Sequence, residues 1–385
     1  MRRRLALASK QPERLLNSPN AIIDHFLCQV LRGEPAPWEE LPGTIAADDL
    51  NERCRHHGVQ SLLYHAMHQR PEWSGWPPQL QQELQAASKA GIAQDLLRSH
   101  CLQQLLNSLS RHRVRVILTK GEALALSLYA IPGTRTRSDT DLFIPIAGLM
   151  RAQQAVHDAG FEIHAPIYKS HQFTVTRKVD PTYAVRFDIH WRIQNSPRFA
   201  RAISFEEGYA NSVELANMGG IRVLDAVDAL LLACMHRWGN ERHDRARLIW
   251  IYDIHLLISS LPESRLREFA HKAVKRNVHL ACLDGVSRAM ELFHTSVPGE
   301  VLALLSSPEP KRTWARRFAA SNLGLLVDDW QLLPDGRSRL NLLKELFLLS
   351  SDALMLKYHK SSKVWLPYLY FRQILGGFTQ RLLLR

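Results

Sequence analysis

The sequence has few cysteines and no long hydrophobic run, and both absences exclude classes of protein. Its 385 residues include five cysteines, and no two have the short spacing of a zinc ribbon or a disulfide framework. Scattered cysteines favour a reducing compartment. No apolar run approaches the length of a membrane span, and the apolar run near the N-terminus is too short for a signal peptide. We therefore expect a soluble, cytoplasmic protein.

Acidic residues are outnumbered, with 37 against 49 basic residues and a net charge of +12. This excess favours an anionic partner, and nucleotide phosphate, nucleic acid and an anionic membrane surface all qualify. The imbalance is strongest from Ala353 onward, where the chain has lysines, arginines and several aromatic residues but no acidic residue. Such a basic tail could lie on an anionic membrane. Packing against the helical part of the protein is the commoner fate.

The spacing of apolar residues changes twice along the chain and divides it into three regions. Residues 1–110 have helical spacing, residues 111–224 alternate strand-like and helical stretches, and residues 225–385 are again helical. The expected helices include 21–31, 48–69 with a break at His57-Gly58, 79–111, 149–159, 311–326 and 340–357. Strands are expected from Arg113 and at 140–144, 172–177, 183–193, 213–215 and 221–224, and Asp180-Pro181 separates the strands at 172–177 and 183–193. Strands that alternate with helices indicate a mixed sheet with flanking helices. The expected fold class is α+β, with an α/β core between two helical regions.

Three carboxylates lie on two predicted strands of the core. Asp139 and Asp141 are one residue apart at the start of a strand, so their side chains should stand side by side. Asp188 lies on the strand around residues 185–192, whose polar face it shares with His190, and His190 is a predicted nucleotide contact. Like charges this close need a cation, and oxygen ligands suit Mg²⁺ bound together with substrate phosphates. The alternative is that Asp139 caps a turn and Asp188 pairs with a neighbouring arginine.

A Lys120-Gly121 turn precedes a predicted helix. A helix N-terminus offers backbone N–H groups and a positive dipole to a phosphate, and glycine lets the backbone approach closely. Arg135 and Arg137, on the loop that leads to Asp139, are predicted to contact a triphosphate or nucleic acid. Ser138, on the same loop, is the remaining predicted nucleotide contact of this segment.

These stretches resemble the uncharacterised nucleotidyltransferase family, whose members share the polymerase-β-type catalytic fold. The resemblance spans most of residues 50–260 and rests on the segments Arg53–Leu63, Leu118–Ala125, Tyr129, Pro132–Leu142, Phe187–Trp191, Leu230–His236 and Leu248–Asp253. It implies that Asp139 and Asp141 are metal ligands and that Asp188 is the third carboxylate. It also implies that Lys120-Gly121 is the phosphate turn.

Two residues depart from the pattern of the wider superfamily. Glu122 stands where a serine usually contacts phosphate, and an acid there would repel phosphate unless it faces away or helps to bind metal. Thr140 stands where an apolar residue is more usual.

His236 and Asp253 are a further recurrent pair of the family, and Asp253 lies among apolar residues where it needs a partner. A hydrogen bond between them would satisfy both, in either a structural or a nucleotide-facing role.

The expected activity is Mg²⁺-dependent transfer of a nucleoside monophosphate from an NTP such as ATP to an acceptor, with release of pyrophosphate and two bound metal ions. RNA, protein, a sugar and a small molecule are open as acceptors, and the base preference and oligomeric state are open as well. One alternative is a non-catalytic protein of the same fold that binds nucleotide or nucleic acid, which Glu122 favours. The other is a membrane-surface accessory protein in polysaccharide biosynthesis, which the basic tail favours.

Overall fold

The computed structural model describes residues 18–164, 171–181, 183–196, 199–215, 220–244, 247–307, 330, 336, 339–340 and 362–372. The helices expected at 311–326 and 340–357 lie outside this part, apart from residue 340. The chain forms two compact units, each assembled from separate segments: unit 1 from residues 1–104, 118–140 and 213–306, and unit 2 from residues 105–117, 141–212 and 307–385. The division into three consecutive sequence regions stays a prediction.

The strands of the described residues form one mixed sheet, which confirms the expected α+β class. Their bounds are β1 (Ile117–Thr119), β2 (Thr140–Phe143), β3 (Glu162–His164), β4 (Gln172–Lys178), β5 (Ala184–His190), β6 (Val213–Leu215) and β7 (Ile221–Val223). Their order across the sheet is β3-β4-β5-β2-β1-β7-β6. Strand β1 pairs in parallel with β7, while the pairs β3–β4, β4–β5 and β6–β7 are antiparallel.

Two strands differ from the sequence prediction. The strand expected from Arg113 begins only at Ile117, because Arg113 has a φ of 55° and the amide of Val114 donates to the carbonyl of Leu109, which closes the preceding helix with a left-handed turn. Strand β3 was not predicted, and its three residues are all exposed, so it has no alternation of buried and exposed side chains to reveal it.

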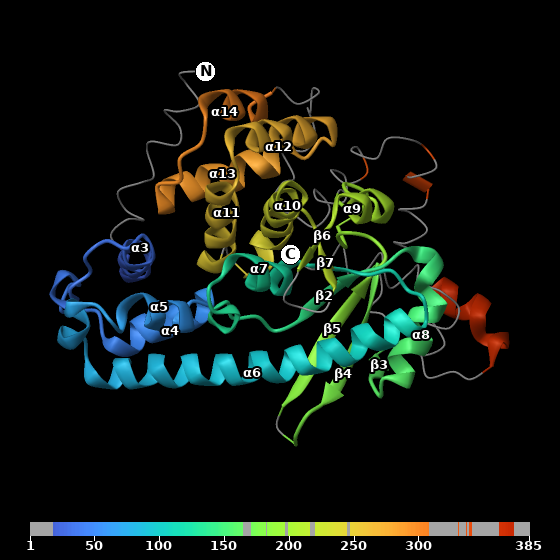
Figure 1. Cartoon of the computed structure of the whole chain (residues 1–385), viewed down its shortest axis with the longest axis horizontal. Coiled ribbons are helices and arrows are strands. Elements are labelled where there is room, and N and C mark those ends of the chain that lie inside the picture. The colour runs from blue at the N-terminus through green and yellow to red at the C-terminus, as the bar shows by residue number, and fades with distance from the viewer. Residues whose placement is uncertain are drawn as a thin grey trace. The chain divides into compact units, whose positions relative to one another are not determined.

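Helices make up most of unit 1. Their bounds are α3 (Pro19–Leu31), α4 (Ala47–His57), α5 (Gln60–Met67), α7 (Lys120–Leu128), α10 (Ala226–Asp244), α11 (Leu248–Ser260), α12 (Glu263–Lys275), α13 (His279–Phe293) and α14 (Gly299–Leu305). Helices α3, α4 and α5 pack together, α10, α11 and α13 form a second group, and α7 packs on α10 and α11 (Figure 1). The expected break after His57 is present, because Gly58 ends α4 with a φ of 70°, which a glycine adopts without strain.

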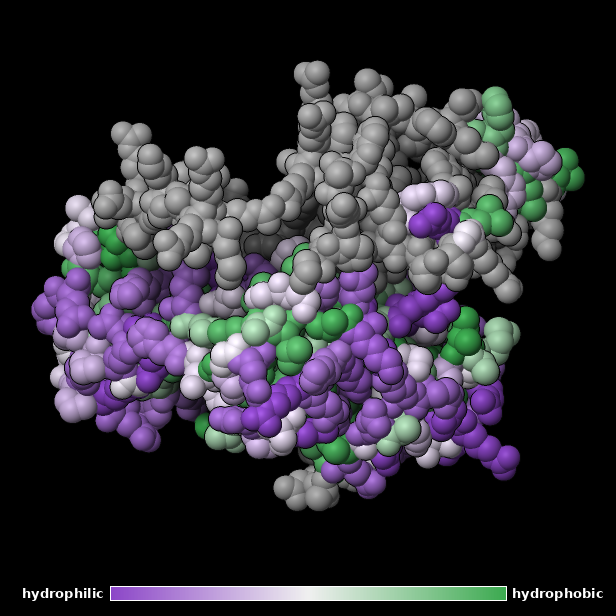
Figure 2. Space-filling view, turned by 90° about the horizontal axis from the view of Figure 1, so that it is seen from above, coloured by the Kyte–Doolittle hydropathy of each residue, from purple (hydrophilic) through white to green (hydrophobic). Residues whose placement is uncertain are grey.

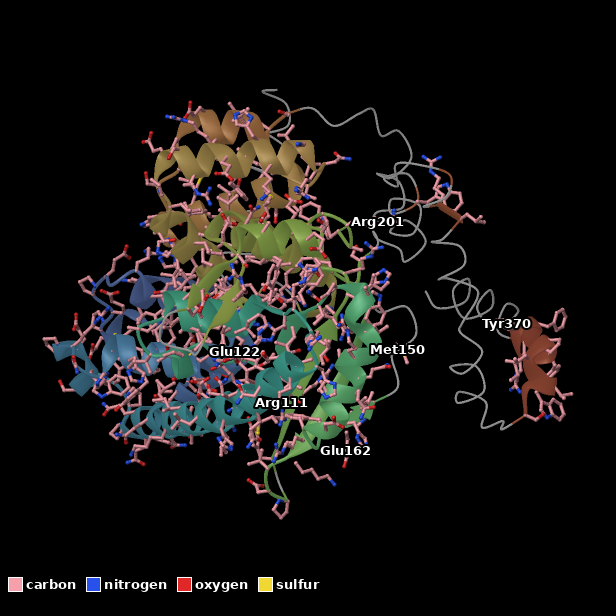
Figure 3. The ribbon with its side chains drawn as sticks, turned by 45° about the vertical axis from the view of Figure 1, so that its right-hand side comes forward. Arg111, Glu122, Met150, Glu162, Arg201 and Tyr370 are labelled. Carbon is pink, nitrogen blue, oxygen red and sulfur yellow. The ribbon has the colours of Figure 1, made fainter. Side chains whose placement is uncertain are left out.

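Unit 2 is built around the antiparallel strands β4 and β5. Helix α8 (Leu149–Asp158) packs on β3, and α9 (Phe205–Asn211) follows β5 in the chain. Phe187 of β5 is fully buried and meets the ring of Phe161 edge to face, so the apolar face of β5 lies on the core. The opposite, polar face carries Asp188. Figure 3 labels Met150 on α8 and Glu162 on β3.

Helix α6 (Pro78–Arg111) contributes residues to both units. Short 3-10 turns lie at Trp38–Glu40, Pro71–Gly75, Pro132–Thr134, Ile146–Gly148 and Lys363–Trp365.

All five cysteines (Cys28, Cys54, Cys101, Cys234 and Cys282) are free and buried. Among the residues described, no helix has the length and apolar character needed to cross a membrane. The described surface in Figure 2 is mainly hydrophilic, with hydrophobic areas between the polar side chains.

Candidate active site

Two of the three predicted carboxylates lie on neighbouring strands within unit 2. Asp141 of β2 and Asp188 of β5 are both buried, at 6% and 5% exposure, and β2 and β5 are adjacent in the sheet. His190 ends β5, and its Nε2 lies 2.7 Å from Oδ1 of Asp141. The hydroxyl of Thr174 donates to Asp188 at 2.6 Å. Each carboxylate is therefore oriented by a side chain on an adjacent strand.

Arg186 also reaches Asp188, with Nη2 3.3 Å from Oδ2, so the predicted alternative of an arginine partner for this carboxylate is present. The arginine side chain is 46% exposed, and an ion pair with so exposed a partner contributes little to stability. The contact leaves Asp188 with a partner that an incoming cation could displace.

Asp139 lies just outside the strand, since β2 begins at Thr140. It is half-buried and interacts electrostatically with Arg135. Asp139 belongs to unit 1 and Asp141 to unit 2, and only Thr140 separates them in the chain. Its assignment as a metal ligand stays a prediction.

The departure at Glu122 is explained by a buried ion pair. Glu122, labelled in Figure 3, is fully buried in the first turn of α7. Nε of Arg137 donates to Glu122 at 2.6 Å, and Nη2 donates to its other oxygen at 3.0 Å. Arg137 also pairs with Asp95 of α6, whose pKa is raised by burial. The charge of Glu122 is thus neutralised by a guanidinium group.

The second departure belongs to the same network, because the hydroxyl of Thr140 donates to Glu122 at 3.0 Å. Thr140 is fully buried, so an apolar residue there would leave this carboxylate oxygen with one donor fewer. The two unusual residues are therefore partners of each other. Their contact joins the first turn of α7 to the residue between Asp139 and Asp141.

A second buried network holds Asp253. Nη2 of Arg135 donates to this carboxylate at 2.5 Å, and the hydroxyl of Tyr129 donates to it at 2.7 Å. Burial, and then the neighbouring Asp253, raise the pKa of Tyr129. Burial lowers the pKa of Arg135, but Asp253 outweighs this effect and the pKa of Arg135 is raised. Tyr129 is therefore held neutral and Arg135 is held positively charged at neutral pH.

This arrangement corrects the expected hydrogen bond between His236 and Asp253. Asp253 is bonded to Tyr129 and Arg135 instead, while His236 is half-buried, accepts from the side chain of Asn240 and packs edge to face on Trp250. A buried carboxylate among apolar side chains is better satisfied by a guanidinium group than by a neutral imidazole. A nucleotide contact for His236 or Asp253 stays a prediction.

The Lys120-Gly121 turn has the backbone conformation of a tight turn. Lys120 has a φ of 52° and is half-buried at the start of α7. A Cβ on Gly121 would lie 2.5 Å from Nη1 of Arg135, so close packing of this guanidinium requires glycine there. The structure supplies this reason for the glycine in addition to the predicted approach of a phosphate. Ser138 is exposed on the loop before β2.

Sequence reasoning missed Asp95, Tyr129 and Thr174 as partners of the site residues. A signal existed for Thr174, because strands β4 and β5 pair symmetrically about Pro181, which sits in the predicted Asp180-Pro181 turn, and this register places Thr174 opposite Asp188. Asp95 and Tyr129 reach partners far away in the chain, for which no local pattern exists.

The carboxylates of Asp141 and Asp188 could bind Mg²⁺ if waters and substrate phosphates supply the remaining ligands. Within the described residues, no group of three or more His, Cys, Asp or Glu side chains could by itself hold a metal ion. Mg²⁺ does not need such a cage, because it commonly binds through one or two carboxylates and completes its shell with waters and substrate phosphates. Asp141 and Asp188, buried on adjacent strands, can supply those carboxylates.

Comparison with known proteins identifies the family of the chain. A search of curated proteins found no match. Among solved structures, the chain is similar to the solution structure of the antibiotic-resistance factor ANT(2'')-Ia, with 14% sequence identity, a TM-score of 0.35, and coverage of 52% of this chain and 98% of that one. A family model for uncharacterised nucleotidyltransferases matches residues 44–294. The chain belongs to this uncharacterised nucleotidyltransferase family.

Proposed function

We propose that the protein transfers a nucleoside monophosphate from an NTP to an acceptor hydroxyl or phosphate and releases pyrophosphate. The observation that carries this proposal is the burial of Asp141 and Asp188 on the adjacent strands β2 and β5, in a chain of a nucleotidyltransferase family. Buried carboxylates on neighbouring strands are costly without a cation, and a divalent ion would compensate them. Asp139 would complete the set of ligands.

Bound Mg²⁺ would stabilise the charge that develops on the attacking and leaving oxygens during an in-line displacement. His190 would hold Asp141 in its ligating orientation, and Thr174 would do the same for Asp188. Asp188 is also the candidate to take the proton of the acceptor hydroxyl. The N-terminus of α7, with Lys120, would receive the triphosphate.

The roles of Arg135 and Arg137 differ in this proposal from the predicted contact with a triphosphate. Both guanidinium groups are buried against carboxylates, so we assign them to holding the loop before β2 rather than to binding phosphate. Lys120, which is half-buried, remains the basic side chain at the turn for the triphosphate.

The non-catalytic alternative loses its main support, since Glu122 is neutralised by Arg137. A peripheral membrane role retains support from the tail, where the side chains of Trp365, Tyr368 and Phe371 are 46%, 53% and 62% exposed. Vesicle binding by this tail would test the membrane role, and it is compatible with the transferase proposal.

The transferase proposal is tested with each α-labelled NTP, Mg²⁺ and a cell extract as the source of acceptor. We expect wild-type protein to transfer label, and Asp139→Asn and Asp141→Asn each to abolish transfer because a neutral amide is a much weaker Mg²⁺ ligand than a carboxylate. Circular dichroism would verify that both variants are folded. Label transfer at the wild-type rate by both variants would show that the site assignment is wrong.

A further inference from the structure

The carboxylate of Glu122 is bonded to two residues that flank Asp139 in the chain. Arg137, two residues before Asp139, donates from Nε to Oε2 of Glu122 at 2.6 Å and from Nη2 to Oε1 at 3.0 Å. Thr140, directly after Asp139, donates its hydroxyl to Oε2 at 3.0 Å. All four residues belong to unit 1. One buried carboxylate therefore holds the chain on both sides of Asp139.

The same carboxylate belongs to the turn that we propose for the triphosphate. Glu122 follows Gly121 directly and lies in the first turn of α7, where its side chain is fully buried. Its three hydrogen bonds to Arg137 and Thr140 thus connect the Lys120-Gly121 turn with the segment that carries Asp139. The proposed phosphate turn and the predicted metal ligand are joined by a single side chain.

Arg137 uses all of its hydrogen-bond donors inside the protein. Its five hydrogen bonds go to Glu122, to Asp95, and to the carbonyls of Pro132 and Arg135, the last two at 3.1 and 2.9 Å. A guanidinium group has no more N–H donors than these. Arg137 therefore has no donor to offer a phosphate, and its side chain determines the shape of the loop before β2.

Helix α6 holds the end of this loop as well. Nη2 of Arg98 donates to the carbonyl of Arg137 at 2.9 Å, and Arg98 is 5% exposed. Asp95, one turn earlier in α6, pairs with the guanidinium group of Arg137. A shift of the loop would leave several of these buried groups without partners, which is costly.

We propose that Glu122 is a positioning residue that fixes Asp139 relative to the Lys120-Gly121 turn, so that metal and triphosphate are received at a fixed spacing. This inference rests on the proposed function, which assigns a metal ion to Asp139 and the triphosphate to the turn. Such spacing matters because a misplacement of about 1 Å at a reacting centre can cost about 100-fold in rate. The acid at the start of α7 then has a role in the site without contact with the substrate.

The test removes the hydroxyl of Thr140, because Thr140→Val keeps the shape of the side chain and leaves the Glu122–Arg137 pair in place. Binding of each α,β-methylene NTP analogue, which cannot release pyrophosphate, is measured by calorimetry with Mg²⁺ and with EDTA. We expect Thr140→Val to weaken Mg²⁺-dependent binding about tenfold and to leave binding in EDTA unchanged, since Asp139 and not the turn is displaced. Thr140→Ser retains the hydroxyl and should restore the affinity.

Thr295→Val is the matched control. Thr295 is 5% exposed, lies in the same unit and donates its hydroxyl to the carbonyl of Ala289 at 2.9 Å. This variant should lose stability as Thr140→Val does and bind the analogues like the wild type. Wild-type affinity of the Thr140→Val protein, or an equal loss of affinity in the Thr295→Val protein, would overturn the proposal.

A wild-type protein that binds none of the analogues would show that the proposed function fails. Hydrogen exchange of the protein without nucleotide or metal then decides separately whether Glu122 holds the loop. Thr140→Val should speed the exchange of residues 133–139 about tenfold and leave that of α12 unchanged, because one buried hydrogen bond of the loop is lost. Unchanged exchange of the loop would refute positioning by Glu122, whatever reaction the protein performs.

Discussion

The effect expected of Glu122 on phosphate binding changes once its ion pair with Arg137 is known. An acid at the start of α7 would oppose phosphate binding, but both of its oxygens accept from Arg137, and Thr140 adds a further hydrogen bond. The resulting group of Asp95, Glu122 and Arg137 carries one net negative charge away from solvent. It connects α6, the first turn of α7 and the loop before β2.

At this scale we expect Glu122→Gln to lower the free energy of unfolding by about 3 kcal/mol, the lower end of the cost of breaking a buried ion pair, because Asp95 still compensates Arg137. Urea denaturation would measure this loss. Glu206→Gln is the control, since it breaks the exposed ion pair with Arg115 and should leave the stability nearly unchanged. Equal stability of the Glu122→Gln and wild-type proteins would show that the buried pair is not stabilising.

Among the elements, the helical segment at 363–372 exposes several large apolar side chains. Its exposed face carries Val364, Trp365, Tyr368 and Phe371, with exposures of 85%, 46%, 53% and 62%, whereas Leu369 is 1% exposed. Figure 3 labels Tyr370 on this segment. Exposed aromatic residues within a tail that has basic but no acidic residues match the chemistry of an anionic lipid surface.

We expect the protein to cosediment with vesicles that contain anionic lipid and not with purely zwitterionic vesicles, because the tail attracts anionic headgroups and the aromatic side chains enter the interface. Replacement of Trp365, Tyr368 and Phe371 by serine should abolish cosedimentation, and added salt should weaken it. Met150→Ser, at a side chain of 76% exposure elsewhere in unit 2, is the control. Unchanged cosedimentation of the triple variant would argue for a protein partner or no partner at this face.

For the whole molecule, histidines whose pKa is lowered in the folded state contribute to the pH dependence of stability. The amide of Leu248 donates to Nδ1 of His57 at 3.2 Å, and Nε2 of His57 donates to Asp24 at 2.7 Å. Both bonds require the neutral tautomer with the proton on Nε2. Burial lowers the pKa of His57 below its usual 6.5, and that of His171 falls to about 4.

A histidine with a lowered pKa in the folded state binds fewer protons than it does in the unfolded chain. Its stabilising contribution is therefore present above the unfolded pKa of 6.5 and is lost as the pH falls toward the folded pKa. Each such group contributes at most about 1.4 kcal/mol per pH unit within its window. We expect the Tm to rise from pH 5 to pH 7, with a smaller rise in the His171→Gln protein. A Tm that does not change over this range would contradict the assignment.

The amino-acid sequence by itself determined the elements and the carriers of the chemistry. The helical spacing of apolar residues predicted α3, α6 and α8 closely, and Gly58 marked the break after α4 because its left-handed backbone suits glycine. Strand alternation assigned Asp188 to the polar face of β5, and the Asp180-Pro181 turn contains the information that places Thr174 opposite it. These features depend on residues close together in the chain, so residue type and spacing are sufficient to predict them.

Only the tertiary structure decided which basic and acidic side chains form ion pairs. Arg135 and Asp253 are 118 residues apart, and Arg137 and Asp95 are 42 apart, so no spacing along the chain indicates either pair. The sequence predicted both arginines as phosphate contacts because they lie on the loop that leads to Asp139, whereas in the structure each is buried against a carboxylate. Burial makes charge compensation obligatory, and the compensating group is chosen by packing between distant segments.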